Sequence, residues 1–114
     1  MLISTQSPGK EIKVKISHYN PKLGGPNCFS FVDGECISSL SNGEKWETYF
    51  ETNDTIACPI ELDFGTRIML NDTIYTCRDR GGEILMAGEA YWIDILAENV
   101  PYAYGEVRTA YIVD

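Results

Sequence analysis

Alternating apolar and polar residues mark the first structured element of the chain. The stretch 11–19 reads EIKVKISHY, so that two isoleucines and a valine fall on one side and two lysines on the other. A period of two is typical of a strand that buries one of its faces. We therefore predict a half-buried strand that ends at Asn20-Pro21 and follows a flexible lead-in over residues 1–10.

Short apolar runs predict further strands in the second half of the chain. They lie at 55–58, 67–70, 73–77, 91–96 and 107–113. A short helical turn is expected only at 98–104, where Pro101 interrupts it. The chain shows neither a long amphipathic helical pattern nor a repeat. Five or six short strands joined by long loops predict an all-β, helix-poor fold, namely a small closed barrel.

The long stretch at 22–54 is irregular, carries only short apolar runs and contains two of the four cysteines of the chain. The four cysteines are Cys28, Cys36, Cys58 and Cys77, an even number without a CxxC pair. This spacing disfavours a zinc ribbon or a thioredoxin-type motif and favours two disulfides in an oxidising compartment. Because a long loop in a small domain is usually functional or cross-linked, we expect a disulfide in this stretch. Four cysteines allow three pairings.

Length and charge exclude several classes of function. The chain has 114 residues, enough for one compact domain, and carries 17 acidic against 9 basic side chains, a net charge of −8. That balance disfavours nucleic acid as a partner, because its phosphates are bound by Lys and Arg. No apolar run approaches the roughly 20 residues of a membrane-spanning helix. The first residues show no signal-peptide hydrophobic region, so export implies either a removed leader or release by another route, such as phage-mediated lysis.

Two aspartates are the candidates for chemistry. Asp79 lies between two arginines, whose charges attract a carboxylate, and is followed by Gly81 and Gly82, which would let a bulky polymer approach the backbone. Asp94 shares a strand face with Trp92 and a leucine, so poor solvation is expected to raise its pKa. Two carboxylates in such contrasting settings are what acid-assisted glycoside cleavage requires.

The same residues also have structural interpretations. An Asp-Arg-Gly-Gly run is often a turn capped by a carboxylate, and a strand aspartate can satisfy backbone donors across a barrel. Cys58 or Cys77 as a nucleophile would need a base, and His18 is the only histidine. A disulfide is therefore the favoured role for these two cysteines.

Five short motifs follow one another in the second half of the chain. They are Ala57-Cys58-Pro59, Phe64-Gly65-Thr66-Arg67-Ile68, Tyr75-Thr76-Cys77-Arg78-Asp79-Arg80-Gly81-Gly82, Trp92-Ile93-Asp94-Ile95-Leu96 and Tyr104-Gly105-Glu106-Val107. Their order and spacing resemble the "3D" (three-aspartate) domain, the double-psi β-barrel core shared with the membrane-bound lytic transglycosylase A family. Upstream, Ser17 to Pro21 and Gly24-Gly25 resemble that domain's opening strand and loop. The resemblance covers roughly residues 11 to 113 and implies a six-stranded double-psi β-barrel domain at 11–114, with one or two short helical turns.

The resemblance implies non-hydrolytic cleavage of the glycan strands of peptidoglycan. Asp94 matches the family's catalytic acid, which would protonate the glycosidic oxygen between N-acetylmuramic acid and N-acetylglucosamine. Its carboxylate would then help to deprotonate the muramoyl 6-hydroxyl, which closes a 1,6-anhydro ring. Asp79 would orient the sugar or stabilise developing positive charge. The candidates for substrate binding are Tyr19, Arg80, Gly81, Gly82 and Trp92.

The chain departs from the family pattern at one position. The family's first aspartate, just before the proline, is replaced by Cys58. Because Cys77 stands just upstream of Asp79, a Cys58–Cys77 disulfide would take over the structural role of the missing aspartate. The other pair, Cys28–Cys36, would close a short loop.

Two rival functions fit the same features. One is a non-catalytic, polysaccharide-binding barrel like barwin and expansin, and the other is a hydrolase whose two carboxylates stand roughly 6.5–9.5 Å apart. In either case the expected partner is a wall polysaccharide, above all peptidoglycan glycan strands. We expect an endolysin-like monomer without cofactor or metal that works outside the cell, in the cell wall or in the periplasm.

Overall fold

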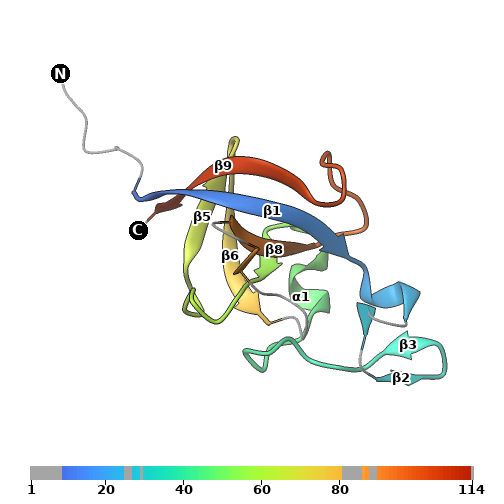
Figure 1. Ribbon diagram of the computed structural model, residues 1–114. Coiled ribbons are helices and arrows are strands. Elements are labelled where there is room, and N and C mark those ends of the chain that lie inside the picture. The colour runs from blue at the N-terminus through green and yellow to red at the C-terminus, as the bar shows by residue number, and fades with distance from the viewer. Residues whose placement is uncertain (1–8, 25–26, 29, 81–85, 88–89, 114) are drawn as a thin grey trace.

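The computed structural model describes residues 9–24, 27–28, 30–80, 86–87 and 90–113 (Figure 1). The strands are β1 (Glu11–Tyr19), β2 (Phe31–Val32), β3 (Glu35–Cys36), β4 (Thr55–Ala57), β5 (Arg67–Leu70), β6 (Thr73–Asp79), β7 (Met86–Ala87), β8 (Ala90–Leu96) and β9 (Glu106–Val113). The helical segments are a 3-10 turn, η1 (Pro21–Leu23), and one helical turn, α1 (Glu47–Phe50). Most of the expected lead-in, residues 1–8, lies outside the described part of the chain.

Six strands close into a barrel. Their order is β1-β9-β5-β6-β4-β8, and β8 pairs back onto β1. The pairs β1–β8 and β4–β6 are parallel, and the other pairs are antiparallel. In chain order, the first three barrel strands are β1, β4 and β5, and the last three are β6, β8 and β9. Exchanging each strand of the first set with its counterpart in the second reproduces the same pairings, so the barrel consists of two interlocked, equivalent halves. The helix-poor, six-stranded double-psi β-barrel expected from the sequence is confirmed.

The barrel interior is filled by every second residue of its strands. Val14 and Ile16 of β1 and Ile93 and Ile95 of β8 are completely buried, whereas Lys13 is exposed. These apolar side chains share one cluster with residues of β4, β5, β6 and β9. The alternation in the sequence therefore determines which face of each strand is inside. Among the described residues, no helix is long and apolar enough to cross a membrane.

A second layer covers part of the outside of the barrel. The stretch between β1 and β4, which we call the insert (20–54), carries η1, the β2–β3 hairpin and α1 (Figure 1). Four buried residues of the insert form a second cluster against Leu96 of β8; they are Cys36, Leu40, Trp46 and Phe50. This layer determines which part of the outer sheet face stays accessible.

The position of the helical turns differs from the expectation. Residues 98–104 form bends and a turn without helix, and the helical segments lie in the insert instead. Asn20 caps η1 by accepting a hydrogen bond from the Lys22 N–H at 3.0 Å, and Pro21 begins the turn. Pro101 brings no N–H donor to the stretch where the turn was expected.

Candidate functional site

Asp79 and Asp94 reach the same face of the sheet through a β-bulge. Ala57 of β4 pairs with Asp94 of β8 on one side and with Asp79 of β6 on the other. The register of β4 against β6 shifts by one residue immediately before Ala57, with Arg78 as the extra residue. Strand side chains alternate, so without the bulge Asp79 would point into the barrel like Cys77, two residues earlier. The extra residue reverses this alternation, and Asp79 points to the outer face, as its pairing partner Ala57 does.

The two aspartates belong to a row of residues across four neighbouring strands. In spatial order these are Asp79 on β6, Ala57 on β4, Asp94 on β8 and Ser17 on β1. Neighbouring strands lie about 4.8 Å apart, so the two aspartate Cα atoms are about 10 Å apart. The small side chain of Ala57 is the only one between them in this row. The fold therefore places two carboxyl groups on the same outer face of the barrel, with one strand between them.

Asp94 is a partly buried carboxyl with an ordered partner. The Ser17 hydroxyl donates to its Oδ1 atom at 3.0 Å, and the Trp92 indole N–H donates to the Ser17 hydroxyl at 2.9 Å. Burial raises the pKa of Asp94 to about 6; the Ser17 hydrogen bond and His18 act in the opposite direction, and the charge of Asp79 adds to the increase. Near pH 6 this carboxyl can therefore both give and take a proton.

Asp79 is held in place by four hydrogen bonds. Its Oδ1 atom accepts from the backbone N–H and the hydroxyl of Ser41 and from the Arg80 N–H, each at 2.8 Å, and its Oδ2 atom accepts from the Tyr19 hydroxyl at 2.7 Å. Burial and then the charge and hydrogen bond of Asp79 raise the pKa of Tyr19, with a smaller contribution from Asp94. Tyr19 therefore stays protonated and serves as a donor.

The guanidinium groups of the two arginines beside Asp79 form no ion pair with its carboxylate in the described structure. Arg78 lies 3.6 Å from Asp54 and stacks on the ring of Tyr49 at 4.0 Å. Arg80 directs its Nη1 atom at the Cys58–Cys77 disulfide and stacks on the ring of Phe64 at 4.3 Å. The charges of these two arginines are therefore engaged elsewhere, because neighbours in an extended chain point to alternate sides. Arg80, a candidate for substrate binding, thus contacts the Cys58–Cys77 disulfide.

The structure contains two disulfides, Cys28–Cys36 and Cys58–Cys77, with Cα–Cα distances of 6.0 and 5.9 Å. The family resemblance implied these same two pairs. Cys58 follows Ala57 directly, and Cys77 directly precedes the bulge. The second disulfide therefore links the two strands at the bulge that brings Asp79 to the outer face.

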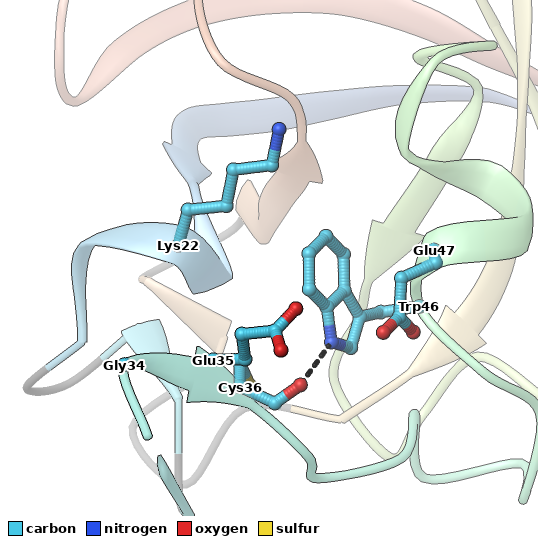
Figure 2. Close-up of a pocket in the computed structure, with 6 residues that line it drawn as sticks. All are labelled: Lys22, Gly34, Glu35, Cys36, Trp46 and Glu47. Carbon is cyan, nitrogen blue, oxygen red and sulfur yellow. Dashed lines mark hydrogen bonds between the residues drawn. The ribbon is translucent and has the colours of Figure 1, made fainter. Parts of the chain in front are cut away.

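A pocket lies in the insert, away from the aspartates. It has a volume of about 340 Å³ and is lined by Lys22, Gly34, Glu35, Cys36, Trp46 and Glu47 (Figure 2). The indole N–H of Trp46 donates to the Cys36 carbonyl oxygen at 3.2 Å, which ties α1 to β3. Neither Asp79 nor Asp94 lines this pocket. The carboxyl groups that line it, Glu35 and Glu47, are exposed, whereas Asp94 is partly buried with a raised pKa, so we place the candidate site on the sheet face.

The structure brings together part of the expected site and adds two serines. Tyr19 and Trp92, two of the candidates for substrate binding, lie beside the aspartates, whereas Gly81 and Gly82 fall outside the described residues. The serines are Ser17, which bonds Asp94, and Ser41, which bonds Asp79. Ser17 could have been found from its place on the predicted strand, but nothing in the sequence marks Ser41. Among the described residues, no cluster of His, Cys, Asp and Glu could hold a metal ion.

Comparisons of the chain with models of protein families, with curated proteins and with solved structures find no match. The resemblance to the three-aspartate domain therefore rests on the order of the sequence motifs alone.

Proposed function

We propose that this protein cleaves peptidoglycan glycan strands as a lytic transglycosylase, with Asp94 as its single acid and base. The observation that carries the proposal is the outward-facing, partly buried Asp94 carboxyl, whose pKa is raised to about 6. A general acid works best when its pKa lies near the working pH. The motif order adds support, because Asp94 stands where the resembling family has its acid.

The chemistry needs two proton transfers, one from Asp94 and one back to it. Protonated Asp94 gives its proton to the glycosidic oxygen while the bond from that oxygen to the anomeric carbon of the muramoyl residue breaks. The carboxylate then takes the proton of the muramoyl 6-hydroxyl as the 6-oxygen bonds to the anomeric carbon. No water is consumed, and Asp94 returns to its protonated form. The Ser17 hydroxyl keeps the carboxyl oriented through both steps.

Asp79 fits the role of a fixed negative charge better than that of a second catalyst. Both of its oxygens accept hydrogen bonds, from Ser41, Arg80 and Tyr19. A carboxylate so fully engaged is a poor base for activating water, which a hydrolase would require. Its charge can still stabilise the positive charge that develops on the sugar ring. This arrangement favours the transglycosylase over the two-carboxylate hydrolase.

The proposed place of action is outside the cytoplasm. Peptidoglycan is found there, and the two disulfides suit an oxidising compartment. In this proposal the protein acts as a monomer and uses no cofactor.

The test is clearing of purified peptidoglycan sacculi by the wild type and by Asp94→Asn. Removing a general acid costs about 10²–10⁴-fold in rate, and we expect a loss in that range. Asp72→Asn, in the exposed turn between β5 and β6, is the matched control and should keep full activity. Wild-type activity in Asp94→Asn would overturn the proposal. A wild type that sediments with sacculi without clearing them would favour the polysaccharide-binding alternative.

A further inference from the structure

The outer face of β8, β1 and β9 carries an aromatic and basic surface next to Asp94. Lys15 of β1 pairs with Trp92 of β8 on one side and with Val107 of β9 on the other. The ring of Tyr104 stands edge-on to that of Trp92, with ring centres 6.0 Å apart, and the Lys15 Nζ atom lies 4.6 Å from the centre of the Trp92 ring. We call Lys15, Trp92 and Tyr104 the aromatic patch.

The aromatic patch is open to solvent. Tyr104 is 80% exposed, and the neighbouring Val107 of β9 is 54% exposed. The loop that carries Tyr104 is nevertheless fixed, because the Gly105 N–H donates to the Ile16 carbonyl oxygen at 2.7 Å. Gly105 has a φ of 79°, a conformation that glycine adopts without strain. The ring of Tyr104 is thus presented to solvent by an ordered turn.

The charge of the aromatic patch is opposite to that of the chain as a whole. Although the net charge is −8, neither Lys13 nor Lys15 forms an ion pair within the described structure. Lys13 donates to Thr109 instead, and the only carboxylate on the same face of β1, Glu11, lies at the far end of the strand. An unpaired lysine over an aromatic ring is suited to a ligand that has both a carboxylate and a flat apolar face.

The position of the aromatic patch relates it to the acid. On β8, Trp92 lies two residues before Asp94, so the two side chains share a face about 7 Å apart. Trp92 is also connected to Asp94 through the Ser17 hydroxyl. A sugar on the patch would therefore neighbour the bond at Asp94.

We infer that the aromatic patch is a glycan-binding subsite that prefers a sugar carrying a carboxylate. This inference rests on the proposed function, since it assigns the substrate sugar next to the cleaved bond. Tyr104 stacks on the ring of the sugar, and Lys15 pairs with the carboxylate that muramic acid carries on its lactyl group wherever no stem peptide is attached. N-acetylglucosamine has no such group, so it uses the stacking contact alone.

The test measures binding in the Asp94→Asn background, so that no substrate is cleaved. The probes are a neutral N-acetylglucosamine tetramer and a peptide-free strand of alternating N-acetylmuramic acid and N-acetylglucosamine, each titrated by calorimetry. Tyr104→Ala should weaken binding of both about tenfold, because the stacking surface is lost, whereas Tyr104→Phe should bind as before. Lys15→Gln should weaken only the carboxylated strand, about fivefold at low salt, and this loss should vanish at high salt.

Lys45→Gln is the matched control, because Lys45 is an exposed lysine of the insert, and it should bind both probes normally. Unchanged affinities in Tyr104→Ala, or an equal loss for both probes in Lys15→Gln, would overturn the subsite. If the wild type cleaves sacculi while Tyr104→Ala keeps its KM, the subsite is refuted and the proposed function stands. If the wild type cleaves nothing but the binding pattern holds, the proposed function fails and the subsite stands.

Discussion

The buried carboxyl of Asp94 leads to a prediction that needs no substrate. In the folded protein its pKa is raised from the ordinary value of 3.8 to about 6, mainly by burial. Between these values the folded state binds more protons than the unfolded state, so stability falls as the pH rises. The contribution of the protonated carboxyl is complete below pH 3.8 and is lost as the pH rises through about 6.

The size of the effect follows from the same shift. The rise of the pKa from 3.8 to about 6 corresponds to a difference of about 3 kcal/mol in the free energy of unfolding between low and high pH. Because Asp94 is only partly buried, screening by solvent reduces this to about 1–2 kcal/mol. Asparagine keeps the shape of the side chain and can accept the Ser17 hydrogen bond, but it carries no charge. Asp94→Asn should therefore raise the free energy of unfolding by about 1–2 kcal/mol at pH 8 and leave it unchanged near pH 3.5.

Urea unfolding at pH 3.5, 6 and 8 measures this difference directly, and the thermal midpoint at pH 8 should rise by about 4–8 °C. Asp72→Asn removes the same charge from an exposed turn and should follow the wild type at every pH. If Asp94→Asn gains nothing at pH 8, or gains equally at pH 3.5 and pH 8, then burial does not raise the pKa of Asp94 and the reasoning is refuted.

Three further predictions follow from the contacts of the site. Tyr19→Phe removes a 2.7 Å hydrogen bond to Asp79 and should lower the free energy of unfolding by about 1.5–3 kcal/mol at pH 7; equal stability in urea would contradict the contact. Replacing Cys58 and Cys77 together by serine should cost about 2–4 kcal/mol, and more than replacing Cys28 and Cys36, because the sequence separation is 19 against 8. The rate of glycan cleavage should fall about tenfold per pH unit above about 6, as Asp94 loses its proton; a rate that rises from pH 6 to pH 8 would exclude Asp94 as the acid.

The strands of the barrel could be predicted from the sequence because each is a local pattern. The alternation at 11–19 identifies β1 to the residue, and the shared face of Trp92, Asp94 and Leu96 follows from the period of two on β8. In both cases, burial of one face decides the structure, and burial can be read from the order of apolar residues.

The arrangement around Asp79 could not be predicted in the same way. Its orientation depends on a bulge that exists only in the pairing of β6 with β4. Its hydrogen-bond donor Ser41 lies 38 residues away in the chain. Arg78 and Arg80 are neighbours in sequence, but strand alternation turns them to other partners. Contacts that depend on how distant strands pair produce no pattern in the local sequence.

The most direct measurement of the central claim is the chemistry of the products. Purified sacculi digested at about pH 5.5 by the wild type, and in parallel by Asp94→Asn, would be analysed by mass spectrometry for the ends of the glycan fragments. We expect 1,6-anhydro-muramoyl ends from the wild type and none above background from Asp94→Asn. Reducing ends from the wild type, or anhydro ends from the variant, would show that Asp94 is not the single acid and base of a lytic transglycosylase.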